Sequence, residues 1–386
     1  MNQVIATERI PIKLWLDDIE DGALQQAKNL ANLPFAIKHI AIMPDSHQGY
    51  SAPIGSVFAT KGMILPYCVG VDIACGMVAQ RTDITLDQFE DTKILQDQLK
   101  EWLGQIREVI PVGFKHNDKP QEDEIFDDVP DIPILNQELN SAKYQLGSLG
   151  GGNHFLEIQE DEEGFIWVMI HSGSRNLGKK VADFYHNKAK ELCSKWYSGV
   201  SSLELAFLPM DTQEGKEYFE AMNFCMKFSY ANRINMLSKV ADIIGKDYFT
   251  GLVYNIHHNY ATWENHFGQN VLIHRKGATL ARKGTIGIIP GSMGTNSYIV
   301  EGLGNEQSFN SCSHGAGRRM GRKEAIRSLN LADEQAKMAG IIGAPRNQDD
   351  LEEAPGAYKP IDEVMENQKD LVKILTKLTP LASIKG

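Results

Sequence analysis

GSLGGGNHFLEIQEDEEGFIWVMIHSGSRNLG, residues 147–178, contains two runs of strand-forming residues on either side of the polar turn EDEEG. Such runs, separated by a short turn that contains glycine, are typical of a β-hairpin. A hairpin centred near Glu162 would place His154 and His171 opposite each other at its open end. A single histidine beside a strand is more often structural. Two histidines placed symmetrically beside glycine-rich turns instead indicate a metal site, because neutral imidazole binds Mn, Zn, Fe and Cu alike.

A second glycine-bounded segment, YCVGVDIACGM at 67–77, carries a carboxylate and a thiol. Asp72 and Cys75 lie between Gly70 and Gly76, where the backbone can fold tightly. Taken alone, Cys75 is a small buried hydrophobic residue. A buried Asp72 in an apolar run needs a partner, however, because an unpaired buried carboxylate is costly. A cation is the obvious partner, and the sulfur could bridge two ions.

The chemistry of these four side chains leaves the identity of the metal open. Thiolate and imidazole favour zinc, whereas carboxylate and water ligands also admit manganese. The candidate ligands are scattered along the chain, unlike the closely spaced pairs of a structural zinc module. The sequence therefore predicts a catalytic metal site that is assembled by the fold.

The segment after residue 253 adds a further ligand candidate and a loop. His257 and His258 follow a β-like run, so alternation along the strand sends one inward and the other outward. One of them is therefore a candidate ligand. The loop PGSMGTNS at 290–297 could offer backbone N–H groups and serines to a phosphate, although it lacks the GxxxxGK[ST] pattern.

His314 has a different setting from the other histidines. It lies in SHGAGRR, before small residues that are followed by Arg318 and Arg319. That setting suits a nucleophile that attacks phosphorus while arginines hold the charge. We therefore treat His314 as a candidate nucleophile rather than a ligand.

The predicted elements alternate irregularly along the chain. Apolar residues at three- and four-residue spacing predict helices over 13–31, 86–108, 178–246, 323–338 and 361–378. Strand-like runs occupy 36–43, 53–60 and 252–301. Because strands do not alternate with single helices, a doubly wound sheet is disfavoured and an α+β architecture is favoured. We interpret residues 1–386 as one domain with a helical insertion at 178–246.

Composition limits the class of protein. The chain has 386 residues, of which 42% are hydrophobic and 23% charged, as in globular proteins. No run approaches the ~20 apolar residues of a membrane helix, and the N-terminus lacks the apolar block of a secretory signal. We therefore expect a cytoplasmic protein without a membrane partner. The five cysteines, an odd number at wide spacing, argue against a disulfide framework.

The net charge of −11 opposes binding of a polyanion by the whole surface, because such binding depends on Lys and Arg. Any nucleic-acid contact must therefore be local. Two basic clusters could supply it. They are His274-Arg275-Lys276 with Arg282-Lys283, and Arg318-Arg319 with Arg322-Lys323. Solvated basic turns explain both clusters equally well.

Six longer motifs point to a known family. They are VGVDIACGM, GGGNHFLE, HSGSRNLG, HRKGAT, PGSMGTNSY and SHGAGRRMGR. Together with MPDSHQGYSAPIG at 43–55 and the C-terminal Ile384-Lys385-Gly386, they make the chain resemble the RtcB family of RNA ligases. The resemblance implies one mixed α/β catalytic domain with central β-sheets, flanking helices and a helical insertion.

The resemblance also implies a reaction. The enzyme would be a GTP-dependent ligase that joins an RNA 3′-phosphate or 2′,3′-cyclic phosphate end to a 5′-hydroxyl end, in RNA repair or tRNA splicing. GTP would be the co-substrate, and two Mn²⁺ ions would occupy each active site. A guanylylated histidine and an RNA-(3′)pp(5′)G end would be the intermediates. The physiological RNA, the need for an activating protein partner and the oligomeric state stay open.

Site residues carry over from the resemblance position by position. The metal ligands would be Asp72, Cys75, His154, His171 and His258, with Cys75 bridging the ions. His258 is preferred over His257 because the family's ligand directly precedes the asparagine that is Asn259 here. His314 matches the histidine that becomes guanylylated. Guanylate contacts would come from Asn153, Glu157, Pro290, Gly291, Ser292, Met293, Ser297, His314, Gly315, Ala316, Gly317, Tyr358 and Lys385. Arg175, Arg318 and Arg322 are weaker candidates for RNA or phosphate contacts.

Two other classes of protein remain as alternatives. A two-metal phosphodiesterase or phosphatase would use the same metal ligands, but it would leave His314, the 290–297 loop and Lys385 without a role. A non-catalytic RNA-binding subunit would keep only the fold. A covalent guanylate on the protein would separate the ligase from both.

Overall fold

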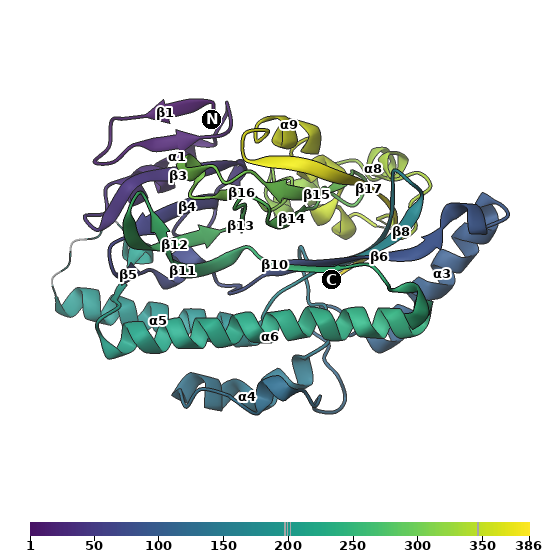
Figure 1. The fold of residues 1–386 in the computed structure, drawn as a ribbon, viewed down its shortest axis with the longest axis horizontal. Coiled ribbons are helices and arrows are strands. Elements are labelled where there is room, and N and C mark those ends of the chain that lie inside the picture. The colour runs from purple at the N-terminus through teal and green to yellow at the C-terminus, as the bar shows by residue number, and fades with distance from the viewer. Residues whose placement is uncertain (197, 199, 201, 346) are drawn as a thin grey trace.

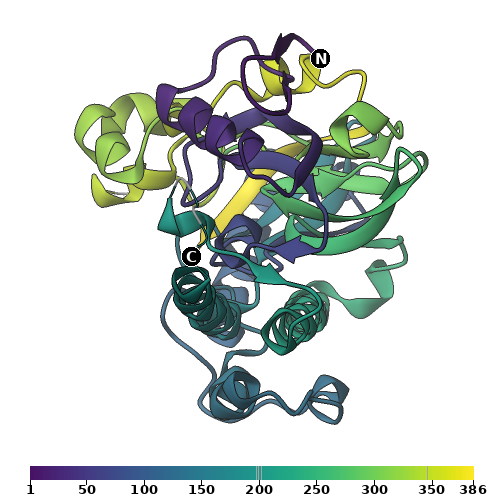
Figure 2. The same ribbon diagram turned by 90° about the vertical axis from the view of Figure 1, so that its left-hand side faces the viewer.

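The computed structural model describes residues 1–386 except 197, 199, 201 and 346. Two larger β-sheets lie above a layer of long helices in Figure 1, and a shorter helix packs beneath that layer. Seen end-on in Figure 2, the two longest helices run side by side under the sheets. Helices and sheets thus form separate layers, and the predicted α+β class is confirmed.

One of the larger sheets has seven strands. They are β6 (Gly76–Thr85), β7 (Phe155–Asp161), β8 (Phe165–Ser172), β10 (Val253–His257), β14 (Ile286–Ile289), β15 (Ser297–Gly302) and β17 (Val372–Lys385). Their order is β10-β6-β8-β7-β17-β15-β14, and neighbouring strands are antiparallel. Antiparallel pairing rules out the doubly wound sheet that the sequence disfavoured.

The predicted hairpin lies at the centre of this sheet. β7 and β8 pair as expected, but His171 faces Phe155 rather than His154. The predicted register was therefore wrong by one residue. His154 precedes β7 instead of lying in the strand, so its side chain is not bound to the strand's alternation. The two imidazole rings still meet, with centroids 5.4 Å apart.

The other large sheet has six strands. They are β1 (Gln3–Ile5), β2 (Ile12–Leu14), β3 (Ala36–His47), β4 (Ile54–Thr60), β11 (Asn259–His266) and β12 (Gln269–Lys276), in the order β1-β2-β3-β4-β12-β11. β5 (Met63–Ile64) pairs with β9 (Leu208–Pro209), and β13 (Ala278–Leu280) pairs with β16 (Ser311–Ser313). The predicted strands over 36–43, 53–60 and 252–301 are confirmed in substance.

The α-helices are α1 (Asp21–Ala31), α2 (Pro66–Val69), α3 (Thr92–Val109), α4 (Pro133–Gln145), α5 (Arg175–Lys195), α6 (Gln213–Ile244), α7 (Arg322–Ser328), α8 (Leu331–Lys337) and α9 (Ile361–Glu366). Short 3₁₀ turns occupy 86–88, 124–126, 203–205, 246–248, 306–308, 349–353 and 355–357. Among the described residues, no helix combines the length and apolarity needed to cross a bilayer.

The predicted helical stretch 178–246 consists mainly of α5 and α6, joined through β9. Residues 197, 199 and 201 of that stretch lie outside the described residues. α6 reaches the sheets through buried polar side chains. Asn232 accepts from the Gly147 backbone N–H at 2.7 Å, and Arg233 donates to Ser172 O at 2.8 Å. The interpretation of this stretch as an insertion within one domain stays a prediction.

Two predicted helices were partly wrong. Residues 12–14 form β2, which pairs with β1 and β3, so α1 begins only at Asp21. Of the predicted helix 361–378, only α9 exists, and β17 follows it between β7 and β15. Leu371, Leu375 and Leu378 recur at four- and three-residue steps, which is helical spacing, but pairing with β7 and β15 on both edges makes the segment a strand.

Two other predicted helices differ at their ends. The helix expected over 86–108 begins at Thr92, because the side chain of Asp91 accepts from the Ile94 N–H and caps it. The helix expected over 323–338 is divided into α7 and α8, and the side chain of Asn330 caps the second. All five cysteines are buried and free, as predicted.

A buried ion pair links the six-stranded sheet to the segment that precedes His314. Arg275 is fully buried and donates to Glu264 Oε1 at 2.5 Å, to Phe309 O at 3.0 Å and to Ser311 Oγ at 2.9 Å. Phe309 and Asn310 have φ values of 52° and 51°, in the left-handed region that non-glycine residues seldom adopt. Arg275 therefore supports a strained turn at the start of β16.

We predict that Arg275→Ala lowers the free energy of unfolding by about 3–5 kcal/mol, because it removes a buried cationic partner that donates two hydrogen bonds to the buried Glu264 carboxylate. Urea unfolding followed by circular dichroism measures this loss. The matched control is Arg282→Ala. Arg282 also pairs with Glu264, at 3.1 Å, but its side chain is 52% exposed, so its removal should cost no more than about 1 kcal/mol. Equal losses for the two variants would contradict this account of the ion pair.

Candidate active site

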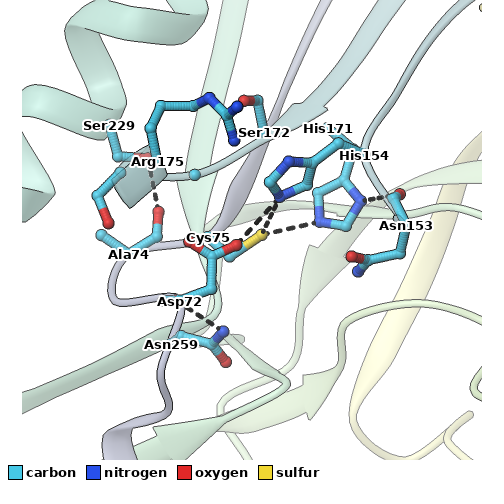
Figure 3. Close-up of polar contacts among 12 residues, drawn as sticks. Asp72, Ala74, Cys75, Asn153, His154, His171, Ser172, Arg175, Ser229 and Asn259 are labelled. Atoms are coloured by element: carbon cyan, nitrogen blue, oxygen red, sulfur yellow. Dashed lines mark hydrogen bonds and ion pairs between the residues drawn. The ribbon is translucent and has the colours of Figure 1, made fainter. Parts of the chain in front are cut away.

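Asp72 and Cys75 lie in a tight loop between α2 and β6 (Figure 3). Ala74 has a φ of 61°, and its backbone is held on both sides: its N–H donates to Asn259 O at 2.7 Å, and its carbonyl accepts from Ser229 Oγ at 2.6 Å. The Asn259 side chain also donates to Asp72 O at 3.0 Å. Contacts from α6 and β11 thus fix the loop that carries the thiol.

Strand pairing brings the three histidines to this loop. β6 begins at Gly76, which faces Ser172 at the end of β8 and His257 at the end of β10. β7 begins beside the end of β8, because the two strands are antiparallel. Ends of four strands therefore meet at one edge of the sheet. The side chains of Cys75, His154, His171 and His258 are gathered there, all buried.

The contact distances define a compact group of donor atoms. Cys75 Sγ lies 3.2 Å from His171 Nε2 and 3.4 Å from His154 Nε2. His171 Nε2 is 3.4 Å from His258 Nε2, and His154 Nε2 is 3.0 Å from Asp72 Oδ2. Two sets of ligand atoms, each mutually within 4.8 Å, share Cys75: one with His171 and His258, the other with Asp72 and His154. The structure thus brings all five predicted ligands together.

Two glycines leave space for this group. A Cβ atom on Gly173 would collide with the carboxylate of Asp72, and one on Gly150 would collide with His154 Nδ1 and Arg175. Gly150 also has a φ of 99°. Both glycines belong to the glycine-rich motifs around the hairpin, so those motifs serve close approach as well as turning.

Burial sets the protonation of the group. It raises the pKa of the Cys75 thiol well above its usual value, and the nearby Asp72 charge raises it further. Burial and neighbouring histidines lower the pKa of His171 and of His258 well below the usual range. Burial, the largest single effect, would raise the pKa of Asp72, but the hydrogen bond and charge of His154, with smaller contributions from Cys75 and Arg175, together lower that pKa. In the protein alone, the neutral imidazoles of His171 and His258 therefore lie beside a neutral thiol and a carboxylate.

The donor set fits a cation. His171 Nδ1 donates to Asn153 O at 3.0 Å, which leaves the lone pair of its Nε2 pointing into the group. Among the described residues, His154 Nδ1 and His258 Nδ1 are buried without a hydrogen-bond partner. Mutual hydrogen bonds do not satisfy so many adjacent acceptors. Thiolate, imidazole and carboxylate are ligands of divalent transition metals, and such an ion would displace the thiol proton.

His314 lies beside the group but outside it. Its ring is 4.7 Å from the His258 ring between centroids, and 16% of its side chain is exposed. Asp45, which is fully buried, accepts from His314 Nδ1 at 2.6 Å and from the His314 backbone N–H at 3.1 Å. Because a carboxylate only accepts, Nδ1 carries the proton and Nε2 keeps its lone pair. This is the tautomer of a nucleophilic imidazole.

Close backbone packing holds His314 in place. A Cβ atom on Gly277 would lie 3.0 Å from His314 Cε1, and one on Gly317 would collide with Asp45 O. The φ values of these glycines are 61° and 72°. Ser313, the preceding residue, exchanges hydrogen bonds with Gln368 at 3.0 Å and 2.6 Å. The His314 ring is therefore confined by Asp45, by Gly277 and by the buried strand β16.

Two of the predicted guanylate contacts lie on paired strands next to the donor group. Glu157, on β7, is buried and accepts from Gln159 Nε2 at 2.8 Å. Burial raises its pKa to about 7. Lys385 lies at the end of β17, with Nζ 5.0 Å from the centroid of the Phe155 ring. Asn153 contributes its carbonyl to His171, as described above.

The 290–297 loop folds back onto the segment after His314. Pro290 O accepts from Ala316 N at 3.0 Å, and a Cβ on Gly315 would also lie against Pro290. Within the loop, the Ser292 N–H donates to Thr295 Oγ1 at 2.7 Å, and the Gly291 N–H donates to Ser297 Oγ at 3.2 Å. The loop therefore contacts Gly315 and Ala316, the two residues that directly follow His314.

A cavity of about 370 Å³ opens beside the C-terminus, with Met293, Ser383 and Lys385 in its lining. Glu353, also in the lining and 3% exposed, accepts from Arg318 at 3.1 Å and from Arg322 at 3.0 Å. It also accepts from the Tyr358 hydroxyl and lies 4.0 Å from Lys385 Nζ. Glu353 thus connects several predicted nucleotide and RNA contacts.

Some candidates have another role. His257 is outside the donor group, where its Nδ1 lies 3.2 Å from both Arg233 Nη2 and Ala74 O. In the first basic cluster, His274, Arg275 and Lys276 are buried, so that part of the cluster is not a surface for nucleic acid. Burial also lowers the pKa of Lys276 to about 8.

Two residues of the site were missed from the sequence. Asp45 belongs to the MPDSHQG motif, and its acidic side chain between proline and serine was a signal that could have been followed. Glu353 lies in the acidic run DDLEEA, where nothing distinguishes it from solvated neighbours. Its burial with three cationic side chains depends on the tertiary fold.

Comparison with known proteins shows the family of the chain. The family model described as tRNA-splicing ligase RtcB matches residues 26–131 and 127–386. The chain is 36% identical to RNA-splicing ligase RtcB of Escherichia coli K12, with 100% of this chain and 99% of the relative covered. It is 31% identical to tRNA-splicing ligase RtcB of Nanoarchaeum equitans, over 98% of this chain and 95% of the relative. The chain belongs to the RtcB family.

Proposed function

We propose that the protein is an RNA ligase that joins an RNA 3′-phosphate or 2′,3′-cyclic phosphate end to a 5′-hydroxyl end at the expense of GTP. The observation that carries the proposal is the His314–Asp45 pair set against the His258 ring of the donor group. A two-metal hydrolase that attacks with metal-bound hydroxide gives this histidine no covalent role, whereas guanylyl transfer needs a ring nitrogen as nucleophile. The names of the relatives, tRNA- and RNA-splicing ligases, support RNA splicing or repair as the process.

The metal centre would hold two Mn²⁺ ions. Cys75 is common to both ligand sets, so its thiolate would bridge the ions, with His171 and His258 on one side and Asp72 and His154 on the other. When bound, the ions neutralise the phosphates of the nucleotide and RNA and favour loss of the leaving group. The manganese assignment follows from the family resemblance, since this donor chemistry also admits other divalent ions.

His314 would be the nucleophile. Its Nε2 lone pair attacks the α-phosphorus of GTP, a nitrogen–phosphorus bond forms, and pyrophosphate leaves. Asp45 stabilises the positive charge that the ring acquires, because it is already hydrogen-bonded to Nδ1. A 2′,3′-cyclic phosphate end is first opened by water to a 3′-phosphate with a free 2′-hydroxyl. The RNA 3′-phosphate oxygen then attacks the same phosphorus, and the bond to His314 breaks. The 5′-hydroxyl finally attacks the RNA phosphorus, and GMP departs.

Glu157 and Lys385 are proposed to bind the guanylate on the strand side of the site. An ionised Glu157 would accept from the guanine edge, and Lys385 would donate to the nucleotide. Asn153, Ser292, Ser297 and Tyr358 would add polar contacts, and Pro290, Gly291, Met293, Gly315, Ala316 and Gly317 would shape the walls around it. Arg175, Arg318 and Arg322 would hold RNA phosphates.

We predict that His314→Ala abolishes acid-labile labelling of the protein by α-labelled GTP and manganese. Asp45→Asn should slow labelling by about 100-fold or more, because an amide can donate to Nδ1 and favour the wrong tautomer. Both variants should keep bound manganese, measured by plasma mass spectrometry. Absence of label on the wild-type protein, with hydrolysis of a 2′,3′-cyclic phosphate retained, would identify a phosphodiesterase and contradict the proposal.

The thiol has its own test. Cys75→Ala should lose bound manganese and all ligation, because it removes the ligand that both sets share. Cys68→Ala provides the matched control. Cys68 is equally buried but bonds Ser51 at 3.0 Å, away from the donor group, so that variant should keep the wild-type metal content. Normal manganese binding by Cys75→Ala would show that the donor group is not the metal centre.

Glu157 predicts a pH dependence of nucleotide affinity. Its pKa of about 7 means that acidification through neutrality protonates the carboxyl and removes the acceptor for guanine. GMP should therefore bind less tightly at pH 6 than at pH 8, by up to about tenfold per pH unit below the pKa. Calorimetry without metal would measure this difference. Glu157→Gln should bind weakly and equally at both pH values; a variant with the wild-type pH slope would remove Glu157 from the guanine site.

A further inference from the structure

We propose that Phe114 is a stacking platform for a nucleobase of the RNA end at the ligation junction. This inference rests on the proposed function and goes beyond the metal, guanylate and phosphate contacts. Phe114 is fully exposed, more so than any other large hydrophobic residue described by the structure. No other aromatic ring contacts it among the described residues. Burying an exposed aromatic ring against a flat apolar partner is favourable, so such a ring at the edge of a site indicates a binding position.

The loop that carries Phe114 is anchored rather than free. Phe114 lies in the turn Val112–Lys115, closed by a Lys115 N–H to Val112 O bond at 3.3 Å, and Gly113 has a φ of 66°. Val112 forms a β-bridge with Gly150, and the Gly113 N–H donates to Gly150 O at 2.8 Å. After the turn, Asn117 Nδ2 donates to Leu146 O at 2.7 Å. The exposed ring is therefore presented by a fixed backbone.

This anchoring places the turn next to the donor group. Gly150, to which Gly113 bonds, packs so closely against His154 that a Cβ there would collide with the imidazole. A Cβ atom on Gly151, the next residue, would lie 3.7 Å from the Gly113 Cα atom. The C-terminal residue lies there too, because the Gly386 N–H donates to His154 O at 3.0 Å. Phe114 thus directly follows Gly113, which packs against Gly150 and Gly151 beside the candidate ligand His154.

Cationic side chains on the same rim fit a nucleic-acid partner. Arg175 Nη2 donates to Gly113 O at 3.2 Å. The guanidinium of Arg322, whose side chain is 48% exposed, lies over Gly152, and Lys115 directly follows Phe114 and is exposed. An aromatic face beside cations is how proteins bind single-stranded nucleic acid: the rings stack on bases while the cations hold phosphates. An apolar protein partner would not need these charges.

The test separates the RNA steps from guanylylation, which uses GTP alone. Phe114→Ala and Phe114→Leu should form the His314 guanylate at the wild-type rate but require more RNA for ligation. The expected rise in KM for RNA is about 5- to 150-fold, corresponding to the loss of one base–aromatic stack. Phe114→Trp should keep the wild-type KM, since it retains an aromatic face. Phe184→Ala, which removes an exposed aromatic of α5, is the matched control and should change neither step.

Abasic substrates identify the stacked base. Removing the terminal base from the 3′-phosphate strand, or from the 5′-hydroxyl strand, should raise the wild-type KM for one of the two ends. With that substrate, Phe114→Ala should cause no further defect. A defect that persists with both abasic ends, a variant that matches wild type, or equal losses in guanylylation and ligation would each overturn the stacking role. Failure of the proposed function differs from all of these, because the wild-type protein would then take no guanylate.

Discussion

A buried thiol among nitrogen and oxygen acceptors is the constraint on which the site depends. Cys75 contacts two imidazoles at 3.2 Å and 3.4 Å, and a third imidazole and a carboxylate complete the group. Packing so many lone pairs together, away from water, is unfavourable without positive charge. The raised pKa of the thiol and the lowered pKa values of His171 and His258 express the same unfavourable packing. A bound cation would relieve it, and the surrounding scaffold would then be stabilised by the ion.

The fold brings together the ends of strands that are distant in sequence, and the candidate ligands lie at those ends. Antiparallel pairing of β10, β6, β8 and β7 sets the ligands at one edge of a sheet, and α6 fixes the connecting loops from below through Asn232 and Arg233. His314 reaches the same edge on a different support, the strained turn and short strand held by Arg275 and Gln368. The candidate ligands and the candidate nucleophile therefore rest on separate supports.

Much of this site was readable from residue types. The hairpin, the ligand candidates Asp72, Cys75, His154 and His171, and the distinct setting of His314 follow from glycine-bounded motifs, because close approach of backbones demands glycine. The choice of His258 over His257 came only from the family resemblance, because strand alternation alone allowed either histidine. The register of His154 did not follow, since a residue just before a strand escapes the alternation rule. β17 was mistaken for helix because its leucines recur at three- and four-residue steps, whereas its strand conformation comes from pairing with β7 and β15, which are distant in sequence. Asp45 and Glu353 were missed because their importance lies in what they touch, His314 and a group of cations, and those contacts join segments far apart in sequence.

The central claim is that the donor group around Cys75 is a metal centre that serves His314. Anomalous diffraction at the manganese edge, from crystals grown with manganese and GTP, tests it most directly. The account predicts anomalous peaks among Asp72, Cys75, His154, His171 and His258, on both sides of the sulfur, with guanylate density joined to His314. Manganese found only elsewhere, with the five side chains arranged as in the metal-free protein, would contradict the account.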